Sequence, residues 1–383
     1  MWNVGCSEVA TRVSIGGLTV IISLFLGYFT LTWQSPGVTA QIPVMMRAAQ
    51  FTPGGPDKLY IGDVPVPVPK NNEVLIKVYA TAVNRADTLQ RKGLYPLPPG
   101  ASDVLGLEAV GVIEQIGSSV DGGWKLGDRV MALLSGGGNA EYVASPAEQL
   151  MPVPDSLDFV TAAAIPEVWL TAYQLLHTIG QVKKGDHVLI HGGGSGVGTA
   201  AIQLVKLAHA RPIVTAGSEA KLKVARSLGA VAGFNYKQEE FTDKVLNATE
   251  GKGVELILDC VGASFYQQNI KCIAVDGTWV VYGLLGGGSI NGDILRQLLL
   301  KRVTITGTTL RARSLPYKKE LVKNFTQQIL PRFESGALKT LIHTVLPLDN
   351  LAEAHRMMEA NENTGKIVIQ VSSSEDNQQK QEL

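Results

Sequence analysis

Residues 187–205 decide the fold and read His187-Val188-Leu189-Ile190-His191-Gly192-Gly193-Gly194-Ser195-Gly196-Val197-Gly198-Thr199-Ala200-Ala201-Ile202-Gln203-Leu204-Val205. This stretch predicts a buried strand, a glycine-rich turn and a helix. The backbone N–H groups at such a helix N-terminus face a pyrophosphate in dinucleotide sites. The spacing departs from G-x-G-x-x-G, because Gly198 comes one position early. A tight connecting turn that binds no nucleotide therefore stays open as an alternative.

Strand and helix patterns alternate after this turn, at the period of βαβ units. The predicted strands cover 212–216, 231–235, 254–259 and 278–283, with helices at 218–228 and near 239–248 and 264–274. Uninterrupted apolar strands such as 254–258 are typical of a parallel sheet that is covered on both faces. The sequence therefore predicts a doubly wound α/β domain over 168–314.

The end of the second predicted strand, at 213–218, indicates which dinucleotide is bound. NAD sites place an acidic residue there to bind the ribose 2′-hydroxyl, whereas NADP sites need small or basic residues. The strand ends without a carboxylate, and Lys221 follows Ser218 by one helical turn. This favours NADP, with Lys221 binding a 2′-phosphate as a point charge. A solvated surface lysine is the alternative interpretation.

Composition sets the broad class of the protein. The 383 residues are 45% hydrophobic and 18% charged with a net charge of zero, so no electrostatic case for nucleic acid exists. Its three cysteines form no C-x-x-C, which favours a reducing compartment. Before residue 168, short β runs at 73–82, 109–117 and 128–134 predict an antiparallel β domain. The predicted strand at 366–371 is positioned to complete that domain, and the polar residues 372–383 are expected to be disordered.

Several motifs together carry a resemblance to a known family. The segments 84–95, 105–111, 127–130 and 163–166 and the glycine turn occur in the order seen in medium-chain dehydrogenases/reductases. Over residues 46–371 the chain resembles their zeta-crystallin-like quinone oxidoreductases, particularly the tumour-suppressor-induced branch. The resemblance implies an α/β fold: a GroES-like antiparallel β substrate domain (45–167 and 315–371) and a Rossmann-like doubly wound parallel-sheet cofactor domain (168–314).

Two positions bear on zinc. Asn84 stands where alcohol dehydrogenases of this superfamily have a cysteine ligand, and Leu107 stands where they have a histidine. Neither side chain binds Zn²⁺, so we expect no metal site. The resemblance then implies direct hydride transfer from NADPH to a quinone or another electron-poor small-molecule acceptor.

The resemblance also implies site residues. Asn84, Asp87 and Tyr95 are the expected catalytic residues, with Asn84 donating to an acceptor oxygen and Tyr95 donating to or stacking on a flat ring. An exposed loop tyrosine is the alternative for Tyr95. The expected cofactor-binding residues are Gly194, Ser195, Gly196, Val197, Gly198, Gly217, Ser218, Lys221, Tyr236, Cys260, Gly262, Tyr282, Gly283 and Lys366.

The expected activity is that of an NADPH:quinone oxidoreductase. An NADPH-dependent enone or alkenal (ene) reductase, and an NADPH-binding crystallin-like structural or sensor protein, remain alternatives. The resemblance further implies a homodimer formed through edge strands of the cofactor domains.

Residues 1–44 precede the family core, and the segment 13–33 contains no charged side chain and is long enough to cross a bilayer. Three interpretations compete: a membrane anchor, a cleaved signal peptide with 38–40 as its small-residue site, and a wrong start site with Met45 or Met46 as the true beginning. We expect the catalytic part in the cytoplasm, with a possible membrane anchor at 13–33.

Overall fold

The computed structural model describes residues 11–15, 18–22 and 42–372, and the chain divides into two units at Pro43. In the first unit, β1 (Thr11–Ile15) and β2 (Leu18–Ile22) pair antiparallel. The rest of the segment 13–33 lies outside the described residues, so the anchor stays a prediction. The predicted tail also lies outside them, apart from Ser372.

A seven-stranded sheet carries the antiparallel part of the second unit. Its path is β16-β17-β5-β6-β7-β9, and β8 pairs with β5 beside that path. As predicted, the C-terminal strand β17 completes this sheet, because Ile367 pairs antiparallel with Val83. The strands are β5 (Glu73–Val83), β6 (Glu108–Ile116), β7 (Arg129–Leu133), β8 (Tyr142–Pro146), β9 (Leu150–Pro152), β16 (Ile342–Pro347) and β17 (Lys366–Gln370), and a separate pair is formed by β3 (Met45–Phe51) and β4 (Leu59–Pro65).

A six-stranded parallel sheet forms the second part, in the order β12-β11-β10-β13-β14-β15. This is the doubly wound order with its switch point beside the first strand, β10. In its two central strands, every residue except His187 of β10 and Glu255 of β13 is buried. The strands are β10 (His187–His191), β11 (Arg211–Ala216), β12 (Ala232–Asn235), β13 (Val254–Asp259), β14 (Ile273–Val281) and β15 (Thr304–Gly307). The predicted α/β fold with two kinds of sheet is confirmed.

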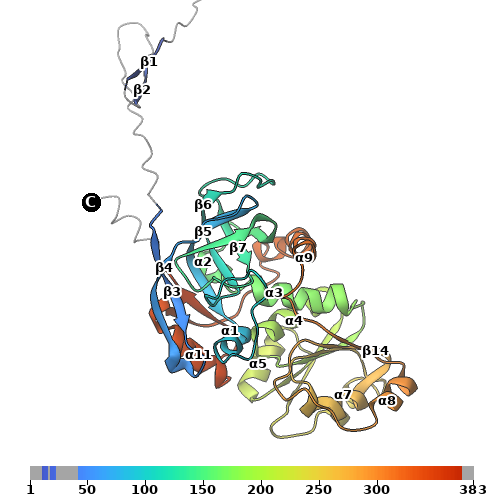
Figure 1. Cartoon of the computed structure of the whole chain (residues 1–383). Helices are drawn as coiled ribbons and strands as arrows, with labels where there is room; N and C mark the ends of the chain where they lie inside the picture. The colour runs from blue at the N-terminus through green and yellow to red at the C-terminus, as the bar shows by residue number, and fades with distance from the viewer. Residues whose placement is uncertain (1–10, 16–17, 23–41, 373–383) are drawn as a thin grey trace, which may run out of the picture. The chain divides into compact units, whose positions relative to one another are not determined.

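Helices link and cover these sheets. Figure 1 shows α3 and α4 beside each other between the two sheets. The helices are α1 (Arg85–Arg91), α2 (Phe159–Ala162), α3 (Pro166–Tyr173), α4 (Gly196–Leu207), α5 (Glu219–Leu228), α6 (Thr242–Ala248), α7 (Tyr266–Cys272), α8 (Ile294–Lys301), α9 (Leu315–Gln328), α10 (Pro331–Glu334) and α11 (Leu351–Glu359). Within the described residues, the run Phe159–Ile179 is apolar and long enough to span a membrane, but most of it is buried inside the protein, so here it is a core segment.

Among the predicted strands of the parallel sheet, the one at 278–283 differs most from the structure. The strand expected at 278–283 begins at Ile273, where β14 already pairs with Val254 of β13. The register then shifts, and Asp276 adopts a φ of 62° in the bulge. The sequence Asp276-Gly277 is typical of a turn, and the bulge accommodates it inside a strand. The domain limits at 167/168 and 314/315 stay predictions, since the described residues from Val44 onward cluster as one unit.

Candidate active site

The glycine turn joins β10 to α4 as predicted. Ser195 is the N-cap of α4, and its Oγ accepts the N–H of Gly198 at 3.0 Å. A Cβ atom on Gly198 would lie 2.2 Å from Gly192 O, so only glycine fits there. The early Gly198 that breaks the usual spacing is therefore required for the close approach of the helix to its own turn.

The turn also contacts the seven-stranded-sheet part. The carbonyl oxygen of Gly194 accepts the N–H of Gly365 at 2.9 Å. A Cβ on Gly196 would lie 2.9 Å from Val168 Cγ1 and 3.0 Å from Lys366 Cδ. The first turn of α4 thus has glycines where a side chain would clash, which is typical of a pyrophosphate site at a helix N-terminus.

Basic groups converge at the end of β11. Ser218 caps α5, and the N–H of Lys221 points to its Oγ at 3.4 Å. Lys221 is half-buried and its Nζ donates to Asn361 O at 2.6 Å. Burial lowers the pKa of Lys221, and the positive charges of Lys237 and Arg85 lower it further. Lys221 is therefore not a solvated surface lysine.

Two cations near Lys221, Arg85 and Lys237, were not among the predicted site residues. The Nη2 of Arg85 donates to Asn361 Oδ1 at 2.7 Å, although Arg85 is more than a hundred residues from Lys221 in the chain. Gly217 provides space for Tyr236, because a Cβ there would lie 2.8 Å from Tyr236 Oη. The site combines three cations and an aromatic ring, which suits an adenosine carrying a phosphate.

The ends of β13 and β14 approach the glycine turn from the other side. Buried Asp259 accepts the N–H groups of Val261 at 2.6 Å and Gly262 at 3.0 Å, which fixes the backbone after β13. Cys260 Sγ lies 3.7 Å from His191 O, and burial is the main cause that raises the pKa of this thiol to about 11.

Tyr282 and Gly283 complete this side of the site. Burial, followed by the neighbouring Cys260, holds the pKa of Tyr282 well above its ordinary value. A Cβ on Gly283 would lie 3.0 Å from Cys260 O. Tyr282 and Gly283 thus both lie close to Cys260, and the raised pKa values keep the Tyr282 phenol and the Cys260 thiol protonated at neutral pH.

Asn84 belongs to a buried polar cluster. Its Nδ2 donates to Glu108 Oε1 at 2.7 Å and to Ala82 O at 3.3 Å, and its Oδ1 accepts from Lys366 Nζ at 2.8 Å. Lys366 forms a buried ion pair with Glu108 at 2.7 Å and also donates to Val83 O at 3.2 Å. The side-chain N–H groups of Asn84 and Lys366 therefore donate to protein oxygens. Of the Lys366 side chain, the aliphatic carbons Cγ and Cδ lie near the glycine turn.

Two carboxyl groups beside this cluster have raised pKa values. Asp87 is fully buried and accepts the N–H groups of Asn84 and Gly106. Burial is the main cause that raises its pKa to about 6. Burial and then the charge of Glu108 raise the pKa of Glu167 to about 8, and in the part of the chain that the structure describes Glu167 Oε2 has no hydrogen-bond partner. Glu167 therefore holds a proton at neutral pH.

Tyr95 lies in the loop after α1 and is half-buried, so it is not the exposed loop tyrosine of the alternative interpretation. The guanidinium carbon of Arg311 lies 5.5 Å from the centre of its ring. Burial, followed by the charge of Glu167, raises the pKa of the Tyr95 phenol. The structure thus places Tyr95 near Glu167, and adds Arg311, for which the sequence analysis had no signal.

The donor set at Asn84 does not fit zinc. The side chain of Asn84 is an amide engaged with Glu108 and Lys366, and Leu107 is an apolar side chain with 1% exposure. Neither supplies the thiolate or imidazole that a zinc site of this kind needs. We therefore derive no step through a metal ion.

Comparison with known proteins gives two family matches. Residues 70–155 match the model described as alcohol dehydrogenase GroES-like domain, and residues 196–327 match the model described as zinc-binding dehydrogenase. Quinone oxidoreductase from Homo sapiens is 33% identical over 329 residues, covering 85% of this chain and 98% of that protein.

Two solved structures are also similar. Quinone oxidoreductase from Escherichia coli, complexed with NADPH, has a TM-score of 0.76 and 28% identity. A protein described as an NAD-dependent alcohol dehydrogenase has a TM-score of 0.75 and 34% identity. Each match covers 85% of this chain and 100% of the other. The two structures differ in the cofactor that their descriptions name.

Proposed function

Because the chain belongs to the quinone oxidoreductase family of the medium-chain dehydrogenases/reductases, we propose that it is an NADPH-dependent quinone oxidoreductase. The observation that carries this proposal is the pairing of a bare helix N-terminus at Gly196 with the basic group at Lys221. The tumour-suppressor-induced branch of this family is our finer assignment, motivated by Ser195 in the glycine turn.

The chain offers a place for each end of NADPH. The N-terminus of α4 would hold the pyrophosphate, and Lys221, Lys237, Arg85 and Tyr236 would hold the adenosine and its 2′-phosphate. The nicotinamide end would lie towards Cys260 and Tyr282. The bound cofactor would supply a hydride, and the buried surroundings of these side chains would exclude water from it.

The acceptor would lie between the nicotinamide side and Tyr95. Asn84 and Lys366 would act as positioning residues, because their hydrogens already bind protein oxygens. Tyr95 would support a flat ring by stacking, and its hydroxyl would donate to an oxygen that gains negative charge. A reduced quinone also takes up a proton, which water or the protonated Glu167 would provide.

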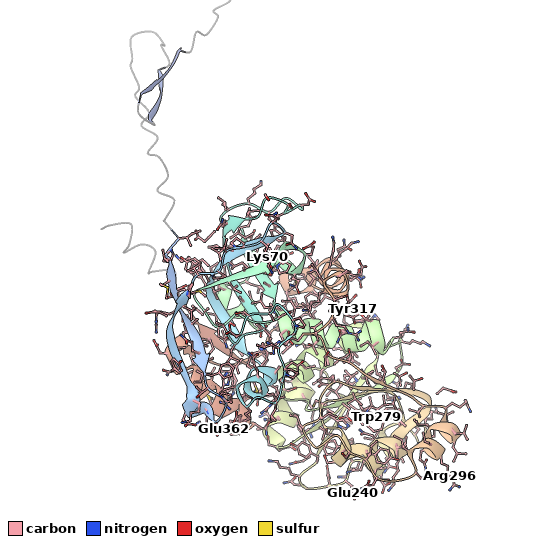
Figure 2. All side chains as sticks on the ribbon, in the orientation of Figure 1. Lys70, Glu240, Trp279, Arg296, Tyr317 and Glu362 are labelled. Atoms are coloured by element: carbon pink, nitrogen blue, oxygen red, sulfur yellow. The ribbon has the colours of Figure 1, made fainter. Side chains whose placement is uncertain are left out.

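A homodimer is part of this proposal. The edge strand β15 has one free side in the described structure, and α8 next to it exposes Leu295, Leu299 and Leu300. Figure 1 shows α8 at the outer end of the six-stranded-sheet part, and Arg296 of this helix is labelled at the same end in Figure 2. Unpaired strand edges and exposed apolar residues are features that subunit interfaces cover.

For localisation we propose a cytoplasmic catalytic part, with an anchor through residues 13–33. Asn247 and Asn324 each begin an N-x-T sequon, at Asn247-Ala248-Thr249 and Asn324-Phe325-Thr326. In a eukaryotic expression host, endoglycosidase treatment should leave the gel mobility of the full chain unchanged. A shift would place the catalytic part in the secretory lumen instead.

Steady-state kinetics test the activity directly. The full chain should oxidise NADPH in the presence of ortho- or naphthoquinones and prefer NADPH strongly to NADH. Turnover with enones or alkenals but with no quinone would make the protein an ene reductase. Tight NADPH binding without reduction of any acceptor would instead make it a binding or sensor protein.

A further inference from the structure

A hollow of about 860 Å³ lies where residues of the seven-stranded-sheet part face the segment 311–318. Small-molecule sites are typically about 300–1,000 Å³ in volume. Four basic and two acidic side chains line it: Lys70, Arg311, Arg313, Lys318, Glu73 and Asp103. The excess of basic groups favours an anionic occupant.

Arg311 has unused hydrogen-bonding capacity in this hollow. Its side chain is 3% exposed, and its Nε donates to Ser135 O at 2.8 Å. Within the described residues, its Nη1 and Nη2 are buried and have no hydrogen-bond partner. Unpaired N–H groups on a buried guanidinium are costly, so a ligand that accepted hydrogen bonds from them would offset that cost.

Lys318 lies beside Arg311 and is 4% exposed. Its Nζ donates to Ser135 Oγ at 2.7 Å and to Arg311 O at 2.8 Å. Within residues 42–372, the hydrogen-bond acceptors of these two cations are all neutral oxygens of Ser135 and Arg311. Two buried positive charges are thus held side by side, with no carboxylate hydrogen-bonded to either.

Tyr95, beside which the acceptor is proposed to lie, is close to Arg311. Its ring lies against the guanidinium of Arg311, with 5.5 Å between ring centre and Cζ. Arg311 thus lies close to Tyr95 and also lines the hollow, so an acceptor beside Tyr95 would place a substituent near this guanidinium. A planar guanidinium matches a carboxylate or sulfonate with two parallel hydrogen bonds.

We propose that Arg311, assisted by Lys318, binds an oxyanion substituent of the acceptor, so that the preferred acceptors are aromatic quinones carrying a carboxylate or sulfonate. This inference rests on the proposed quinone reduction. It makes Arg311 a specificity-determining residue, because a neutral quinone leaves its N–H groups unpaired.

The test compares two acceptors with the full chain and NADPH: 1,2-naphthoquinone and 1,2-naphthoquinone-4-sulfonate. Wild type should have the higher kcat/KM for the sulfonate. R311Q should lower kcat/KM for the sulfonate roughly tenfold to hundredfold, mainly by raising KM. It should change kcat/KM for the neutral quinone far less. The matched control R313Q removes one charge from the same hollow, but the Arg313 side chain already donates to Thr308 Oγ1 and Thr309 O, so this substitution should lower the ratio of the two acceptors far less.

Two results would overturn the inference. R311Q could lower kcat/KM equally for both acceptors, or R313Q could lower the ratio of the two kcat/KM values as much as R311Q does. If R311Q does not fold, as judged by NADPH fluorescence, R311K replaces it and should lower the sulfonate preference by losing the two-pronged contact.

A binding measurement separates this inference from the proposed activity. With NADPH present, 2-naphthoate should raise the melting temperature of the wild-type protein, and neutral 2-naphthylmethanol should not. If no quinone is reduced but 2-naphthoate still stabilises wild type and not R311Q, the proposed activity fails and the anion site stands. If neither compound stabilises the protein, the anion site fails.

Discussion

Gly198 has no room for a side chain, because a Cβ there would lie 2.2 Å from Gly192 O. Gly198→Ala should therefore lower the free energy of unfolding by about 1–3 kcal/mol and weaken NADPH binding, because the first turn of α4 must move. Denaturant unfolding and NADPH fluorescence measure both effects. Gly307→Ala is the control, since its Cβ would meet only Val281 O, at 4.0 Å. Equal effects of the two substitutions would contradict the close-approach argument.

Glu167 should make the protein less stable as pH rises. Its pKa is about 8 in the folded protein and near 4.5 when unfolded, so the folded state keeps a proton that the unfolded state loses between these values. Stability then falls by up to roughly 1.4 kcal/mol per pH unit across this range. Glu167→Gln should flatten the decline in melting temperature between pH 5 and pH 8.

The control for this prediction is Glu353→Gln on the exposed face of α11. Arg356 lowers the pKa of Glu353 below its ordinary value, so its titration affects stability only at acidic pH. The slope between pH 5 and pH 8 should therefore stay as in wild type. An unchanged slope in Glu167→Gln would mean that Glu167 is ionised in the folded protein.

Individual site residues differ in how far the sequence could reveal them. The start of a helix at the glycine turn was predictable from a local motif, and Ser195 caps α4 there. Arg311 and Glu167 belong to no local motif, and their importance arises from burial and from partners that are distant in the chain. The sequence suggested that Asn84 donates to the acceptor, but it could not show that Glu108 and Lys366 already engage its amide.

Among the secondary-structure elements, those with strong caps were predicted well. The helix after Ser218 begins at Glu219 and ends before Gly229, whose φ of 117° suits the predicted C-cap. The start of β14 differed from the prediction, because the bulge in this strand depends on pairing with β13 and on the contact of Asp276 with Arg302. Tertiary contacts decide such a boundary, and a local pattern does not contain them.

Helix α5 provides a test of cofactor choice. Lys221→Gln should lower kcat/KM for NADPH about tenfold and leave that for NADH unchanged, because only NADPH carries the 2′-phosphate that this half-buried lysine would bind. Lys223→Gln, on the same helix but exposed, should change neither value. Kinetics with both cofactors measure the effect, and a parallel loss for NADPH and NADH would contradict the assignment.

Over residues 44–372, the two sheets depend on one another at the candidate site. The glycine turn belongs to the six-stranded sheet, yet Gly194 binds Gly365 and Lys221 binds Asn361, both from the turn that precedes β17. The sequence predicted both sheets, because alternating and uninterrupted apolar patterns are local. It could not predict these links, since they join positions more than a hundred residues apart. Cofactor binding at this junction should therefore stabilise both parts together.

We expect helix α8 to mediate the association of whole molecules. Leu295 and Leu299 are each 77% exposed, which is unusual for two leucines on one helix unless a partner covers them. In a dimer through β15 these side chains would be buried, so Leu295→Lys with Leu299→Lys should shift the full chain from dimer to monomer in light scattering. The control Leu126→Lys changes a leucine with 63% exposure outside this region and should leave the molar mass unchanged. A dimer that survives both leucine substitutions would require another interface, and a monomeric wild type would contradict the homodimer itself.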